Sequence, residues 1–264
     1  MIVDYHAHLR DEGQRVLHTV ETVERWVEEA DRLGVAEIAF TEHFYYFLET
    51  RPLLTVPYQI DHCHISVEPY VEAISDAKER GLPVKLGVEV DYYPGREEEI
   101  RELLGRHPWD FVLGSVHYLD GLGVDQEPSL VGALGAEEAY RRYFETLARA
   151  ARSGLFDSLA HPDLVKFFGG LVEWDAETFV DGLDGVCLEV STAGLRKPHE
   201  RIYPEADLLS AARRAGVSIT LASDAHEPKD VGRDLDRGIE RARIAGYETL
   251  TVFEGRRPRQ EPLG

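Results

Sequence analysis

The chain has 264 residues, 43% of them hydrophobic, which is enough to bury one substantial core, and we expect a single domain over residues 1–264. Its 49 acidic and 29 basic residues give a formal charge of −20, which would repel a nucleic-acid backbone and disfavours that class of partner. The two cysteines, Cys63 and Cys187, lie far apart and indicate neither a disulfide framework nor a thiolate zinc site. No run reaches the ~18 apolar residues of a membrane span. We therefore expect a cytoplasmic protein without a membrane partner.

Short apolar runs alternate with longer amphipathic runs along most of the chain. Seven apolar runs are predicted to form strands, at residues 2–6, 35–41, 84–91, 111–117, 158–161, 185–191 and 217–223. Seven amphipathic runs are predicted to form helices, at residues 19–33, 67–80, 97–106, 136–153, 176–182, 205–215 and 232–245. This alternation predicts βα units around a parallel sheet, which at this length fits one α/β barrel.

Two connections are long for a compact domain. Residues 44–66 contain aromatic residues, prolines and two histidines, and residues 119–135 are rich in glycine. Loops of this length are more often functional than idle, so we expect both to form the rim or lid of an active site. The last residues, 255–264, are rich in proline and arginine and are predicted to be a loose or peripherally docked tail.

Histidines and carboxylates recur where the predicted strands end. His6 and His8 stand two residues apart, so an extended strand would project both rings to the same side. Six further candidates end or follow later strands: His43, Glu89, His117, His161, Asp224 and His226. Because parallel strands of a barrel end at one mouth, these side chains are predicted to meet there as metal ligands.

Eight candidate ligands exceed the three or four that one zinc-like ion takes from a protein, so several ions are expected. Imidazole and carboxylate groups without thiolates suit zinc, iron, manganese or cobalt, and the sequence does not choose among these metals. Glu42, which precedes His43, would point away from it along a strand and is predicted to be structural. The other histidines, His18 among them, lie in helix-edge or loop contexts where a solvated ring is expected.

The candidate ligands form a series of motifs in chain order: an opening HxH, a histidine closing the second strand, a central glutamate, two isolated histidines and a final DxH. This series resembles the polymerase-and-histidinol-phosphatase (PHP) family. Within that family, residues 87–92, 114–118, 161–166 and 189–197 are most similar to the monofunctional histidinol-phosphate phosphatases.

The resemblance implies a distorted (β/α)7 TIM-like barrel with two or three divalent transition-metal ions such as zinc, iron or manganese. The implied ligand sets are His6, His8, Glu89 and Asp224 for one ion, Glu89, His117 and His161 for a second, and His43, His226 and a first-loop residue for a third. Many family members have a further histidine six residues after the HxH, where this chain has Gln14. Asp11 is assigned to the third ion, with Glu12 as the alternative.

The implied reaction is hydrolysis of a small phosphomonoester, L-histidinol phosphate, to L-histidinol and phosphate in histidine biosynthesis. A hydroxide bridging two ions would attack phosphorus in line, and Glu89, Asp224 and His226 are the expected catalytic residues, with the acid for the leaving group left open. Three cations after the fifth and sixth strands are candidates for substrate binding: Lys166, Arg196 and Lys197.

Four alternatives share part of this pattern. A PHP nuclease or nucleotidase would use the same ligands but would need a cationic groove, which the charge of −20 disfavours. A generic small-molecule phosphatase would lack the substrate preference. An amidohydrolase barrel usually has a lysine closing a middle strand, where this chain has Glu89. A metal-binding barrel without turnover is the non-enzymatic alternative, and the oligomeric state is not indicated.

Overall fold

The structure, a computed structural model, describes residues 1–264 except for the surroundings of Gly169. Seven parallel strands form one sheet in the order β1-β4-β5-β6-β9-β10-β11. The bounds of these strands are β1 (Val3–Ala7), β4 (Glu37–Phe40), β5 (Val84–Asp91), β6 (Phe111–Ser115), β9 (Ser158–Leu159), β10 (Cys187–Ser191) and β11 (Ile219–Ala222). All seven predicted strands are present, and most differ from their predicted bounds by one or two residues at an end.

The sheet curves round until its first and last strands meet, which gives a nearly closed barrel. The His8 N–H donates to the carbonyl of Ala225 at 2.8 Å, and the Ala225 N–H donates to the carbonyl of His6 at 3.3 Å. Beneath this contact, the buried Asp4 carboxylate accepts hydrogen bonds from the backbone of Ser223 at 2.9 Å and of Gly232 at 2.8 Å. Asp4 therefore joins the start of the barrel to its end.

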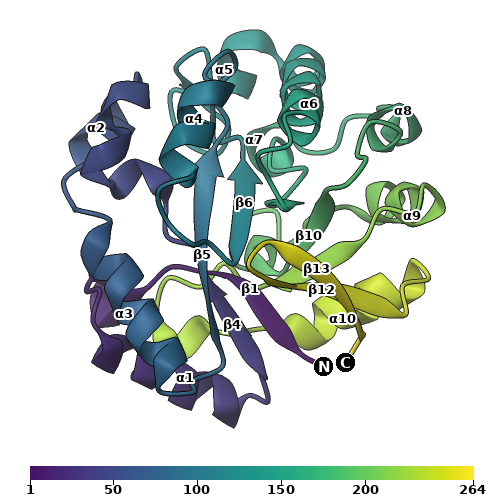
Figure 1. The fold of residues 1–264 in the computed structure, drawn as a ribbon. Coiled ribbons are helices and arrows are strands. Elements are labelled where there is room, and N and C mark those ends of the chain that lie inside the picture. Colours follow the sequence, from purple (N-terminus) through teal and green to yellow (C-terminus); the bar gives the residue numbers. More distant parts are fainter.

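The seven predicted helices are also present, and they surround the strands (Figure 1). Their bounds are α1 (Val20–Arg32), α3 (Glu68–Glu79), α4 (Glu97–Leu104), α6 (Ala136–Arg152), α8 (Ala176–Val180), α9 (Ala206–Arg214) and α10 (Leu235–Ile244). In α1, Trp26 is fully buried and its indole N–H donates to the carbonyl of Arg10 at 2.7 Å. The (β/α)7 barrel prediction is confirmed. No helix in the described part of the chain is long and apolar enough to span a membrane.

The long connections contain short elements that the sequence pattern did not reveal. Residues 44–66 form 3-10 turns and α2 (Pro57–His62), and residues 118–134 form β7 (Tyr118–Leu119), β8 (Leu122–Gly123) and α5 (Leu130–Leu134). Two other connections contain β2 (Arg10–Asp11), β3 (Arg15–Val16) and α7 (Lys166–Gly169). These segments are ordered extensions of the barrel mouth, held by their own short hydrogen-bonded pairs.

The tail that was predicted to be loose or peripherally docked forms one strand of a hairpin that is bonded to the barrel. β12 (Thr249–Glu254), which was not predicted, pairs along its whole length with β13 (Arg257–Pro262). The hairpin lies across the barrel in front of the strands in Figure 1, with the two termini side by side. The Phe253 N–H donates to the Tyr5 hydroxyl at 3.0 Å, and the Gly255 N–H donates to Asp110, which precedes β6, at 3.1 Å. The hairpin therefore closes the amino end of the barrel.

Candidate metal centre

All eight predicted ligands lie together at the carboxyl end of the strands, and Glu89, at the end of β5, is their centre. Its carboxylate oxygens lie 2.7 to 3.9 Å from ring nitrogens of five histidines: His43 at 2.7 Å, His161 at 3.3 Å, His117 at 3.5 Å, His6 at 3.6 Å and His8 at 3.9 Å. Asp224 Oδ1 lies 3.3 Å from His8 Nε2 and 3.6 Å from His226 Nδ1. Side chains from positions 6 to 226 thus form one cluster.

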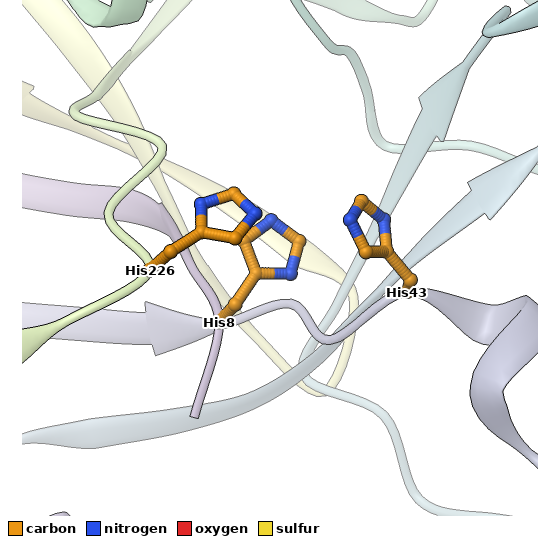
Figure 2. Close-up of side chains that lie close together, drawn as sticks. All are labelled: His8, His43 and His226. Carbon is orange, nitrogen blue, oxygen red and sulfur yellow. The ribbon is translucent and has the colours of Figure 1, made fainter. Parts of the chain in front are cut away.

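The cluster contains three groups of ligand atoms, each compact enough to surround one ion. Within each group the atoms lie no more than 4.8 Å from one another. The groups are His6 with His8 and Asp224, His6 with Glu89 and His161, and His8 with His43 and His226. Figure 2 shows the last group, in which the rings of His8 and His226 lie against each other and His43 faces them from the next strand.

Carboxylates behind the cluster orient three of the rings. The Nδ1–H groups donate to Glu189 from His6 at 2.9 Å, to Glu42 from His8 at 3.1 Å and to Asp91 from His117 at 3.0 Å. Since Nδ1 carries the proton in each neutral ring, Nε2 is left with its lone pair toward the centre. This is how histidines that bind metals are usually held.

The spacing between facing ring nitrogens fits a shared metal ion. His6 Nε2 lies 3.2 Å from His8 Nε2, and His117 Nε2 lies 3.2 Å from His161 Nε2. In the metal-free cluster a ring proton can bridge each pair as a hydrogen bond. Two nitrogens on one tetrahedral ion with bonds of 2.0–2.1 Å are separated by about 3.3 Å, which is nearly the same spacing. Both oxygens of Glu89 and Nδ1 of His43 are buried without hydrogen-bond partners. The residues present therefore fit divalent cations.

The ionisation of the metal-free cluster is mixed. Burial would raise the pKa of Glu89, but the charges of His117, His6 and His43 outweigh it and hold the pKa well below its usual range. Burial and the neighbouring His8 lower the pKa of His43 to about 4. Burial also acts to lower the pKa of His117, but Asp91 and Glu89 raise it to about 10. Glu89 and His43 are therefore unprotonated at neutral pH, whereas His117 must lose a proton to bind an ion.

Two cluster residues adopt backbone conformations that non-glycine residues avoid. His161 has φ of 24° and Asp224 has φ of 54°. Such conformations cost roughly 1–3 kcal/mol each and persist when the surroundings demand them. Here each lies in the turn directly after a strand, where the chain must aim a ligand back across the barrel mouth.

The structure does not bring Asp11 into the cluster, which corrects the sequence-based assignment to the third ion. Its carboxylate accepts hydrogen bonds at 2.8 Å from the Glu12 N–H and from Arg15, and it pairs with Arg25 at 2.8 Å. These hydrogen bonds lower the pKa of Asp11. Gln14, three residues on, lines the cavity in front of the cluster instead.

Lys166 is also committed elsewhere, which corrects its prediction as a substrate-binding residue. The side chain is 1% exposed and its ammonium lies 3.0 Å from Asp163 and 3.0 Å from Glu205. The ammonium also donates to the carbonyl of Ile202 at 2.8 Å. Lys166 therefore joins the loop after β9 to the segment that precedes α9, and it does not line the cavity.

The two other predicted cations differ from each other. Lys197 lines the cavity. Arg196 donates from Nη2 to the carbonyl of Ser223, next to Asp224, while its Nη1 is buried without a hydrogen-bond partner. Arg196 is not among the residues that line the cavity, and its part in substrate binding stays a prediction.

Sequence reasoning missed the supporting residues. Glu42 is fully buried and faces the cluster: it binds His8 and also accepts a hydrogen bond from Arg10 at 3.2 Å. His18 was expected in solvent, yet its ring is 3% exposed and lies 3.7 Å from Glu42. Asp91 is the last residue of β5, and that position was the signal available for it, whereas Glu189 lies in the middle of β10.

The cavity over the cluster has a volume of about 220 Å³. Both long loops contribute to its wall, as predicted for an active-site rim. The wall contains five tyrosines, Tyr45, Tyr46, Tyr58, Tyr118 and Tyr203, together with Asp125 and Gln126. The cavity is thus lined by the charged cluster and by aromatic side chains.

A β/α barrel with histidine and carboxylate ligands converging from its strand ends defines the class of metal-dependent barrel enzymes. Residues 4–193 match the family model of the PHP domain. The chain belongs to the PHP domain family, and the family resemblance noted in the sequence is confirmed.

Two relatives support this membership, and a solved structure shares the fold. The chain is 34% identical over 247 residues to a probable histidinol-phosphatase of Deinococcus radiodurans, covering 89% of this chain and 91% of the relative. It is 30% identical to a histidinol-phosphatase of Bacillus subtilis, covering 84% and 93%. The structure of the histidinol phosphate phosphatase of Lactococcus lactis, complexed with zinc, L-histidinol and phosphate, has a TM-score of 0.78 at 23% identity and covers 97% and 98%.

Proposed function

We propose that this protein is a metal-dependent phosphomonoesterase that hydrolyses L-histidinol phosphate to L-histidinol and phosphate in histidine biosynthesis. The observation that carries the chemistry is the convergence of eight candidate ligand side chains, with Glu89 at their centre, beneath a small cavity. The substrate is inferred from the relatives at 34% and 30% identity, which share the name histidinol-phosphatase. The location in the cytoplasm stays a prediction.

Two or three divalent transition-metal ions are proposed for the cluster. His6, His8 and Asp224 with Glu89 would hold one ion, and Glu89 with His117 and His161 a second. For the third, His8 now joins His43 and His226, since Asp11 is engaged by arginines. Bound there, such ions neutralise phosphate oxygens and lower the pKa of water toward neutrality.

The remaining roles belong to side chains around the cluster. Lys197 lines the cavity and is proposed to bind phosphate oxygens through its positive charge. Arg196, which donates to the carbonyl of Ser223 next to Asp224 and has an unpaired Nη1, is proposed as a second cation near the site. Burial would raise the pKa of Asp224, but the charge of His6, the strongest opposing influence, helps to outweigh burial and to hold that pKa well below its usual range. Asp224 is therefore ionised and able to take a proton, whereas burial lowers the pKa of His226 and leaves it neutral.

The size and charge of the site favour a small metabolite over a nucleic acid. A volume of about 220 Å³ suits a compact phosphomonoester, whereas a nucleic-acid strand needs an extended cationic groove. The net charge of −20 opposes such a groove. Both observations therefore disfavour the nuclease and nucleotidase alternatives.

The test is phosphate release from a panel of esters by protein loaded with zinc, iron or manganese. L-histidinol phosphate should be hydrolysed with a kcat/KM well above those of p-nitrophenyl phosphate, mononucleotides and short DNA. Equal turnover of all esters would indicate a generic phosphatase, and preferred cleavage of DNA or nucleotides would replace the proposal with the nuclease alternative.

A further inference from the structure

Asp125 is the one acidic residue that lines the cavity outside the ligand cluster, among the residues that the structure describes. The other two acids of the cavity wall, Glu89 and Asp224, contact the clustered histidines. Asp125 belongs to none of the three ligand groups. Its Oδ1 atom is buried without a hydrogen-bond partner. A buried, unpaired carboxylate oxygen is costly, and the cost is removed when a donor binds it.

The segment that carries Asp125 is held in place on both sides. The Val124 N–H donates to the carbonyl of His117 at 2.8 Å, and the Gly123 N–H donates to the carbonyl of Pro128 at 3.0 Å. The Tyr118 hydroxyl donates to Gln126 at 3.0 Å. The carboxylate is therefore positioned before a ligand arrives, which reduces the entropy that binding would lose.

The surroundings of Asp125 suit an organic cation. Tyr118 and Tyr203 line the same cavity as Asp125. The Tyr118 hydroxyl also binds Gln126, the residue after Asp125, which keeps that ring next to this segment. An ammonium group among these rings would gain an ion pair with Asp125 and contact with aromatic faces.

We propose that Asp125 binds the ammonium group of the substrate and so makes the site selective for amino-substituted phosphomonoesters. This inference rests on the proposed function. In L-histidinol phosphate the amine lies one carbon from the phosphorylated CH₂ and is charged at neutral pH. The cluster and Lys197 bind the phosphate and Asp125 binds the ammonium, so that groups lining one cavity match the substrate's two opposite charges.

The test compares two esters that differ only in the amine: L-histidinol phosphate and 3-(imidazol-4-yl)propyl phosphate. Asp125→Asn keeps the size of the side chain and removes its charge. The variant should lower kcat/KM for L-histidinol phosphate by about 10- to 100-fold, the range for a hydrogen bond to a charged group. Activity on the ester without the amine should change by less than about twofold. Asp125→Ala should shift the ratio in the same direction.

The ratio of the two activities within one variant cancels differences in folding and metal loading. Asp120→Asn is the matched control, because Asp120 is an exposed acid on the same loop and pairs with Arg142 outside the cavity. It should leave the ratio unchanged. Calorimetry with zinc-loaded protein provides a readout without turnover: Asp125→Asn should weaken binding of L-histidinol and not of 3-(imidazol-4-yl)propanol.

The remaining outcomes are distinguishable. An equal loss of activity on both esters in Asp125→Asn would overturn the inference and assign Asp125 to the chemical step. A wild-type enzyme that hydrolyses both esters equally would also overturn it, while leaving a phosphatase. A wild-type protein that releases phosphate from neither ester would overturn the proposed function and the inference together.

Discussion

Acidic side chains at the two ends of the barrel differ in whether their carboxylate oxygens have hydrogen-bond partners. At the carboxyl end, Glu89 is 1% exposed and neither of its carboxylate oxygens has a hydrogen-bond partner. At the amino end, the Asp110 carboxylate accepts from the Leu86 N–H at 2.9 Å, from the Gly255 N–H at 3.1 Å and from Lys78. Glu89 lies in β5, and Asp110 directly precedes β6, the neighbouring strand of the same sheet. Their different hydrogen bonding therefore reflects what each end of the barrel has to bind.

The amino end of the barrel therefore contributes mainly to stability, and the carboxyl end carries the chemistry. Unpaired buried polar groups cost about 1–3 kcal/mol each, and two ligand residues add backbone strain. Cations bound in the folded state alone would offset those costs. The amino end carries less of this burden. Trp109 Nε1 is unpaired there and Arg256 in the hairpin turn has φ of 62°, but the acids are paired and aromatic rings pack beneath the hairpin. Substitutions at the two ends should therefore affect different properties.

The largest effect is expected from Glu89→Gln, which removes the charge at the centre of the cluster. Phosphatase activity should fall by about 10³-fold or more, because the positive charges of the ions lose their shared counter-charge. Elemental analysis should show fewer bound metal equivalents, while the metal-free variant unfolds at a temperature no lower than metal-free wild type.

Asp110→Asn is the matched control at the amino end. It should lower the free energy of unfolding by about 1–3 kcal/mol, since it weakens the contact with Lys78, and should leave the metal content unchanged. A Glu89→Gln protein with full metal content and activity would refute the proposed centre.

Phe253→Ala should produce the opposite pattern to Glu89→Gln, with lower stability and an unchanged metal content. The Phe253 ring is buried and lies 5.0 Å, between centroids, from Phe111 and 6.2 Å from Tyr5. Its removal should lower the free energy of unfolding by about 3–5 kcal/mol in denaturant titrations, as for other buried phenylalanines. Metal equivalents per folded chain should not change. Phe168→Ala, at a ring that is 39% exposed, should cost less than about 1 kcal/mol.

Arg196→Ala should reduce kcat/KM by about 10²-fold, equivalent to ~2.7 kcal/mol. The substitution removes the free Nη1 donor and the hydrogen bond to the carbonyl of Ser223, which precedes Asp224. Steady-state kinetics on L-histidinol phosphate would measure the effect. Arg201→Ala is the control, because Arg201 is 48% exposed and pairs with Glu205. Kinetics like those of wild type in Arg196→Ala would remove Arg196 from the site.

The barrel and the positions of the eight cluster residues were predictable because they depend on regular periodicity. Parallel strands end at one mouth, so a ligand-type residue at each strand end is a repeated signal. The hairpin had a signal too: β12 is rich in threonine and β-branched or aromatic residues, and Gly255 follows it. It was missed because the alternation of strands and helices stops there.

The loop residues were not predictable, because their partners are set by the tertiary structure. Nothing local distinguishes Lys166, whose charge is met by Glu205 from another βα unit, from a lysine that faces a ligand. Asp11 faces two arginines only because the loop returns as β3 and packs near α1. The position of the Glu42 side chain was not predictable for the same reason. β4 ends at Phe40, so the alternation of a strand does not continue to Glu42, and the side chain turns toward His8.

The smallest expected effect concerns Gln14, the position where many family members have a histidine. Gln14 lines the cavity with His43 and His226 and has φ of 59°, a conformation that histidine tolerates better than most residues. Gln14→His should add an imidazole to the group at the third ion. It should tighten retention of that ion by about tenfold, the lower end of what a partner in a metal site contributes. Metal equivalents retained during dialysis against a weak chelator would measure this, with Gln14→Asn as the control that keeps an amide. If Gln14→His and wild type lose their ions at the same concentration of chelator, the third ion is held by His8, His43 and His226 without help from the first loop.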